Sequence, residues 1–167
     1  MRTPRLIAAL SAVALSFVTV PAASADPTVS CTGGAIKSQF TPGLTYQPRT
    51  QSVRTDAYSY CTGSRISRAT VTLNTSGTGQ CAPMGVPEGS GSGVIKWSDG
   101  SSSQFDATVS IMLTGSDIAG EITSGRFAGQ QVEIRGGQDS ELGDAVTACY
   151  TGSLRVLSSE VEHLTVG

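Results

Sequence analysis

Hydrophobic and polar residues alternate in several stretches of this chain with the period of two that is typical of β-strands. The clearest stretch is 104–113, where apolar residues occupy the odd-numbered positions from Phe105 to Leu113 and polar residues the even-numbered positions from Gln104 to Ser110. One face of this segment should be buried and the other exposed to solvent. Weaker patterns predict further strands at about 28–40, 51–61, 66–74, 94–98, 145–157 and 160–166.

A turn sequence, Asp99-Gly100, joins two of these strands and predicts a β-hairpin. A two-residue loop would put Ile95 and Trp97 on the face opposite Phe105. A three-residue loop with Gly100 in the left-handed conformation puts all three on one face. We therefore expect a bulged three-residue turn.

Ser124-Gly125 predicts a second hairpin. A two-residue loop there would pair Ile122 with Phe127. The apolar positions change phase further along the chain, and a bulge near Gly129 would reconcile them, because glycine permits a bulge at little cost.

The segments between the strands are expected to be loops, and none shows a convincing helical period. The composition agrees, because the chain has 14% charged and 5% aromatic residues with 20 glycines, and strong helix formers are sparse. We predict an all-β protein with a single antiparallel β-sandwich or barrel of about seven to nine short strands. The expected loops are 41–43, 75–92 and 136–144.

The N-terminal 25 residues have the features of a secretory signal peptide. Arg2 and Arg5 precede a mostly apolar run, and Ala23-Ser24-Ala25 resembles a cleavage site. The run is too short to span a bilayer comfortably, so we expect no membrane insertion. The mature protein is expected to begin at Asp26, to form a single β domain over 26–167 and to be secreted.

All four cysteines lie after this signal segment, so two disulfides are expected in an oxidising compartment. Four cysteines allow three pairings. We favour Cys31 with Cys61, which would tie two neighbouring N-terminal strands, and Cys81 with Cys149, which would fasten a mid-chain loop to a late strand. The cysteines are too far apart in sequence to suggest a metal site.

The charge of the chain argues against two classes of partner, namely nucleic acids and anionic membranes. The chain has 11 basic and 13 acidic residues, and removal of Arg2 and Arg5 leaves 9 against 13, about −4 for residues 26–167. No basic block is present, so we expect binding neither to nucleic acid nor to an anionic membrane.

Three segments, 26–33, 91–100 and 123–129, resemble parts of small secreted actinobacterial proteins whose function is uncharacterised. The second includes Trp97-Ser98-Asp99-Gly100. The resemblance implies export and a β fold, and it carries no catalytic residues over to this chain.

Catalytic patterns are missing from the sequence, so we do not expect an enzyme. His163 is the only histidine and lies near the C-terminus, where a surface role is the simpler interpretation. A hydrolase ranks third among the functions considered, and it would need two carboxylates to converge in a cleft. No cofactor or metal is expected, and the acidic segment of Asp139, Glu141 and Asp144 is interpreted as a solvated loop, with calcium binding as the weaker alternative.

The predicted strand that ends at Cys61 suggests a binding surface. If the cystine faces the core, then Arg54, Asp56, Tyr58 and Tyr60 share the outer face. Flat rings with polar tips beside charged groups suit contact with a cell-wall polymer, a glycan or a protein. The alternative is that the tyrosines form the buried set. A non-catalytic extracellular binding protein with an unknown ligand is the leading expectation.

The second candidate function is inhibition of a secreted serine protease. The segment 81–87 is tethered by a predicted disulfide and contains two prolines, so Pro83, Met84 and Gly85 could be held extended with Met84 entering the specificity pocket of the protease. A plain disulfide-anchored connection is the simpler interpretation.

Overall fold

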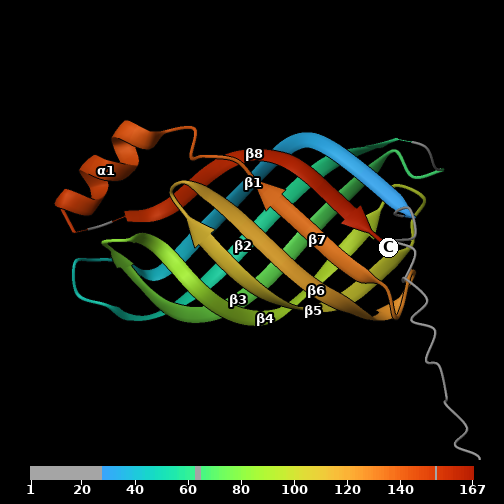
Figure 1. Ribbon diagram of the computed structural model, residues 1–167, viewed down its shortest axis with the longest axis horizontal. Coiled ribbons are helices and arrows are strands. Elements are labelled where there is room, and N and C mark those ends of the chain that lie inside the picture. The colour runs from blue at the N-terminus through green and yellow to red at the C-terminus, as the bar shows by residue number, and fades with distance from the viewer. Residues whose placement is uncertain (1–27, 63–64, 153) are drawn as a thin grey trace, which may run out of the picture.

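The computed structural model describes residues 28–62, 65–152 and 154–167, and the predicted signal segment lies outside them. Eight antiparallel strands follow one another around a closed barrel, with one helix before the last strand (Figure 1). The fold is therefore all-β, as expected, and of the two architectures left open it is the barrel. The elements are β1 Val29–Leu44, β2 Arg49–Thr62, β3 Arg68–Cys81, β4 Met84–Trp97, β5 Ser102–Met112, β6 Gly115–Gly125, β7 Gln131–Gly136, α1 Leu142–Tyr150 and β8 Leu154–Val166.

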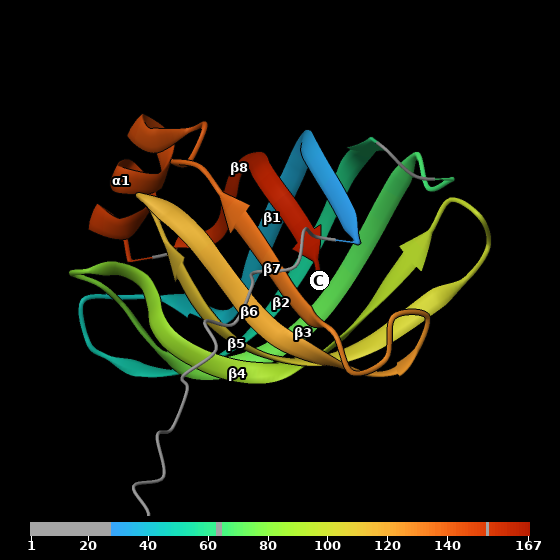
Figure 2. The same cartoon turned by 45° about the vertical axis from the view of Figure 1, so that its right-hand side comes forward.

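Each strand pairs with its neighbours in sequence, and β8 closes the barrel against β1. The connections therefore alternate between the two ends of the barrel. The β1–β2 and β3–β4 hairpins and α1 lie at one end, and the C-terminus lies at the other (Figures 1 and 2). Closure leaves no free strand edge in the sheet, which removes the most common site of edge-to-edge aggregation in β proteins.

Inward-facing side chains fill the barrel. Alternate residues of the strands are buried, including Phe40, Leu73, Ile95, Phe105 and Ile134, each at most 2% exposed. An eight-stranded barrel encloses just enough space for side chains of this size, so the interior forms the hydrophobic core. Ser38 and Thr55 are also buried, and their hydroxyls are joined by a hydrogen bond of 2.9 Å.

The β4–β5 hairpin has the predicted bulged three-residue turn. Trp97 N–H donates to the Ser101 carbonyl, so the loop is 98–100, and Gly100 has φ +87°. Ile95, Trp97 and Phe105 are buried on one face. The odd-numbered positions of the apolar residues on both sides of the turn thus correctly predicted a three-residue loop.

The predicted hairpin at Ser124-Gly125 is wrong. Strand β6 continues through these two residues because Ser103 of β5 pairs with Gly125 after a bulge. The chain turns later, and Ile122 N–H donates to the Gln130 carbonyl across the loop. The bulge expected near Gly129 is present at the end of this loop: Gly129 N–H donates to the Ile122 carbonyl, and Gly129, at φ +83°, and Gln130 lie together opposite the single residue Ile122.

The expected loop 75–92 is a strand pair. β3 and β4 run through it, and only Ala82 and Pro83 lie between them. Apolar alternation does not mark this segment because glycine and serine are common in it. This segment is instead held by the backbone pairing of β3 with β4, in which Thr75 lies opposite Gly91.

The expected strand 145–157 is also wrong in its first half, because Leu142–Tyr150 form α1. Only Ala145 and Cys149 of this nine-residue helix are buried, so its apolar face is too short to show a period in the sequence. Asp139 in the preceding segment is buried rather than solvated: its carboxylate accepts the backbone N–H groups of Glu141 and Ser158 and so orders the entry to the helix.

Both favoured disulfides are present. Cys31 and Cys61 are directly opposite each other on β1 and β2, and Cys81 at the end of β3 joins Cys149 of α1. The second bond therefore links a strand end to a helix rather than a loop to a strand. Two disulfides are compatible with an oxidising environment.

Candidate functional site

The outer face of β2 carries the four residues that the sequence analysis grouped together. Val53 and Ala57 point into the core, so Arg54, Tyr58 and their partners of the same parity point outward. The alternative, in which the tyrosines form the buried set, does not occur. We call this surface the tyrosine face; it consists of Arg54, Asp56, Tyr58 and Tyr60 of β2 with Arg68 of β3.

A bulge in the neighbouring strand supports Tyr58 in this orientation. Between Thr32 and Ala35, β1 contains one more residue than β2 does between Tyr60 and Tyr58. Gly34 lies in this bulge at φ +100°, and a Cβ at this position would be 2.0 Å from the Tyr58 carbonyl oxygen. Glycine is thus required where β1 passes the backbone of Tyr58.

The two tyrosine rings contact each other and a cation. Their centroids are 5.8 Å apart at an interplanar angle of 81°, an edge-to-face arrangement. The Arg68 guanidinium carbon lies 4.8 Å from the centroid of Tyr58, within the range of a cation–π contact. Tyr58 is half-buried, whereas Tyr60 is 54% exposed. The face therefore presents one ordered, accessible ring beside a positive charge.

An ion pair defines the other end of the face. Arg54 donates two hydrogen bonds to Asp56, of 2.9 and 3.0 Å, and the Thr72 hydroxyl donates a third of 3.1 Å. The Arg54 contact is the main reason that the pKa of Asp56 is lowered, and the same contact raises the pKa of Arg54. Both side chains are substantially exposed, so the pair orders the surface more than it stabilises the fold.

In an NMR pH titration, we expect the Asp56 carboxyl to titrate below the usual aspartate pKa of about 3.9. Because the folded pKa is depressed, the contribution of this group to stability is present above about pH 4 and is lost as the pH falls through the folded pKa. Arg54→Gln should raise the pKa, and Thr72→Val should raise it less. An Asp56 pKa at or above the usual value in the wild-type protein would contradict this assignment.

The residues proposed for protease inhibition do not form an extended loop. Pro83 lies in the two-residue connection between β3 and β4, and Met84 begins β4, half-buried against the core. Gly85 follows within the strand, where a Cβ would lie 2.2 Å from the Ile111 carbonyl oxygen. With Met84 turned toward the core, nothing in this geometry favours insertion into a specificity pocket.

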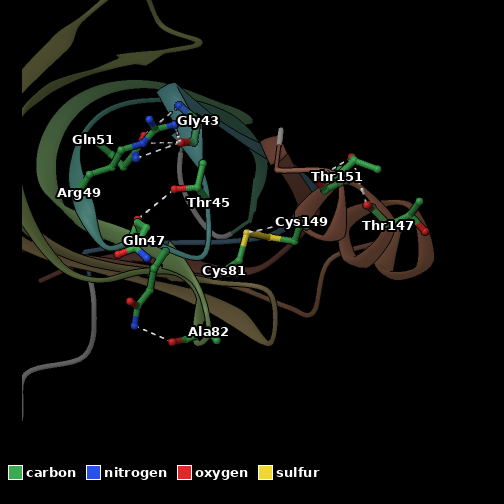
Figure 3. The surroundings of a disulfide bond; sticks show 12 residues. Gly43, Thr45, Gln47, Arg49, Gln51, Cys81, Ala82, Thr147, Cys149 and Thr151 are labelled. Atoms are coloured by element: carbon green, nitrogen blue, oxygen red, sulfur yellow. Dashed lines mark hydrogen bonds between the residues drawn. A yellow bond between two sulfur atoms is a disulfide. The ribbon is translucent and has the colours of Figure 1, made fainter.

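Sequence reasoning missed a second aromatic pair, at the end of the barrel that carries α1. Tyr46 and Tyr150 are 53% and 75% exposed, and their ring centroids are 6.2 Å apart. Cys81 brings them together, since its N–H donates to the Thr45 carbonyl and its sulfur bonds to Cys149, the neighbour of Tyr150 (Figure 3). The sequence signal that bears on this contact is the predicted Cys81–Cys149 disulfide, which places the residue before Tyr150 next to Cys81.

One carboxylate pair lies in a groove, which is the arrangement that a hydrolase would need. Asp106 of β5 and Glu121 of β6 are directly opposite each other on the outer surface of the barrel. Both side chains are exposed to solvent.

Within 28–62, 65–152 and 154–167, no helix has the length and apolar character needed to span a bilayer. His163 is half-buried on β8, opposite Arg135 of β7. Comparison of the chain with protein-family models, with curated proteins and with solved structures returns no match.

Proposed function

We propose that this protein is secreted and acts as a non-catalytic extracellular binding protein that contacts its ligand through the tyrosine face. The observation that carries the proposal is the edge-to-face pair of Tyr58 and Tyr60, in which Tyr60 is 54% exposed and the Arg68 guanidinium lies against the Tyr58 ring. An exposed aromatic ring costs solvation free energy in the unbound protein, and covering it with a ligand recovers that free energy.

The rigidity of the face supports this role. Its tyrosines lie near the C-terminal end of β2, which is paired with a strand on each side, and the Cys31–Cys61 disulfide joins β2 to β1 next to Tyr60. Binding would therefore order few side chains, which reduces the entropic cost of association. A cell-wall polymer, a glycan and a protein surface all suit such a face, and insoluble wall polymer is the first ligand to test.

The experiment is a pelleting assay with insoluble cell-wall polymer and residues 26–167, the expected mature form. We expect saturable binding by the wild-type protein and at least a tenfold loss of affinity for Tyr58→Ala/Tyr60→Ala, because tyrosine is enriched among the few interface residues whose truncation costs about 2 kcal/mol or more. Circular dichroism and thermal unfolding must show that the variant is still folded.

Tyr46→Ala/Tyr150→Ala is the matched control, because it removes two exposed tyrosines from the opposite end of the barrel. Its binding should match that of the wild type. Absence of wild-type binding would exclude wall polymer as the ligand, and equal loss in both variants would mean that the tyrosine face has no specific part in binding.

A further inference from the structure

A polar groove of about 880 Å³ crosses the outer surface of the barrel and adjoins the tyrosine face, because Asn74 in its lining lies directly opposite Arg54. It extends over strands β3 to β6 and reaches the start of β7. One wall is a row of side chains that are directly paired from strand to strand, so that they form a continuous ladder across the sheet. This row consists of Asn74, Ser92, Asp106, Glu121 and Gln131.

The second wall is a parallel row two residues along each strand. Ser76 pairs with Ser90, Ser90 with Thr108 and Thr108 with Ala119. All four are exposed. The two walls thus present hydroxyls, amides and carboxylates on short side chains, which leave the space between them open.

Small inward-facing residues form the floor between the walls. Thr75, Gly91, Ala107 and Gly120 are paired in succession across four strands. A Cβ at Gly91 would be 2.0 Å from the Asn74 carbonyl oxygen, and one at Gly120 would be 2.0 Å from the Asp106 carbonyl oxygen. Larger residues at these positions would force the strands apart, so the hollow depends on glycine.

The charge of the groove is negative and uncompensated. Asp106 and Glu121 are directly opposite on neighbouring strands, a placement that destabilises a sheet through repulsion. Among the described residues, no lysine, arginine or histidine lines the groove. The ion pairs found in the described residues join other acids, namely Asp56, Asp99 and Asp117, to arginines. A cation from a ligand would relieve this repulsion.

The dimensions suit an extended chain. Five strands at a spacing of about 4.8 Å make the first wall about 19 Å long, the length of about six residues of extended peptide. Successive peptide groups could exchange hydrogen bonds with the hydroxyl and amide side chains of the two walls. The described residues that line the groove include no aromatic side chain, which would be needed as a flat apolar platform for a sugar ring.

We propose that this groove binds an extended peptide segment of a partner protein, with a lysine or arginine side chain of the peptide between Asp106 and Glu121. The groove and the tyrosine face adjoin at Asn74 and Arg54 but share no residue, so each surface can be tested, and can fail, separately. The proposal also accounts for the like-charged pair, which lowers stability in the free protein and becomes favourable when the cation is bound.

The test uses fluorescence anisotropy with labelled hexapeptides of alternating lysine and serine or of alternating glutamate and serine. The lysine peptide should bind and should shift the NMR amide signals of Ser92, Asp106 and Glu121; the glutamate peptide should not bind. Asp106→Asn/Glu121→Gln should weaken binding of the lysine peptide at least tenfold. This variant should unfold at the wild-type temperature or higher, because the replacement removes a repulsion.

Glu88→Gln/Glu133→Gln is the matched control: it removes the same charge from two exposed acids outside the groove. Its affinity should stay within twofold of the wild-type value. Equal weakening in both variants would mean that the peptide is attracted by the net charge of the protein alone, and this result would overturn the proposal. The proposal would also be overturned if the lysine peptide did not bind at millimolar concentration, or if a glucosamine oligosaccharide of similar length and charge bound more tightly.

Discussion

Replacing Phe105 by alanine should lower the free energy of unfolding by about 3–5 kcal/mol, the range for deleting a large buried aromatic side chain. Phe105 is 1% exposed. Its ring also covers the backbone of Gly93 on the neighbouring strand, where a Cβ would lie 2.8 Å from two ring atoms. Glycine has no side chain that could move into the vacated space, so the cavity should remain largely open.

Urea denaturation of the wild type and of Phe105→Ala measures this effect. Gln104→Ala is the appropriate control, because Gln104 is on the same strand but faces solvent, and exposed substitutions usually change stability by less than about 0.5 kcal/mol. A loss below about 1 kcal/mol in Phe105→Ala would mean that the barrel interior repacks freely, contrary to the dense core described above.

Removing the Cys81–Cys149 disulfide with two alanines should cost about 4 kcal/mol of unfolding free energy. The bond closes a segment with a sequence separation of 68, and loop-closure entropy predicts about 4.4 kcal/mol for a loop of that length. The bond also holds α1, which is nine residues long and buries only two of them. A helix this short is unstable on its own in water, so α1 should unfold locally before the barrel does.

Two measurements check this prediction. Equilibrium unfolding of Cys81→Ala/Cys149→Ala gives the global loss, and amide hydrogen exchange should show loss of protection in α1 with the barrel strands still protected. Cys31→Ala/Cys61→Ala is the comparison. Its sequence separation of 30 predicts a smaller cost of about 3.6 kcal/mol, and the bonded strands are already paired. Unchanged protection of α1 without its disulfide would contradict the expectation.

The tyrosine face and the polar groove make different demands on the fold. Tyr58 and Tyr60 need only the alternation of one strand and a bulge in its neighbour. The groove needs the register of five strands, with glycine at two paired positions of its floor. A register change in β4 or β6 would therefore remove the groove and leave the tyrosine face in place.

The same contrast explains which elements could be predicted. The outward direction of Tyr58 and the inward direction of Phe105 follow from alternation within a single strand. The turn at Asp99-Gly100 follows from the parity of the apolar residues on both sides. The strand pair over 75–92 could not be found in this way, because its glycine and serine positions carry no hydrophobic pattern and are held by the hydrogen bonds of the strands on either side.

By itself, the sequence determined the all-β class, the buried face of the clearest strands, the turn type of one hairpin and the pairing of the four cysteines. Each of these depends on local alternation, on the chemistry of a few turn residues or on a choice among three pairings. The tertiary structure decided the closure of the barrel, the helix over Leu142–Tyr150 and the meetings of Asp106 with Glu121 and of Tyr46 with Tyr150. These features depend on register and packing between different segments, and local alternation carries no information about which residues will lie opposite one another.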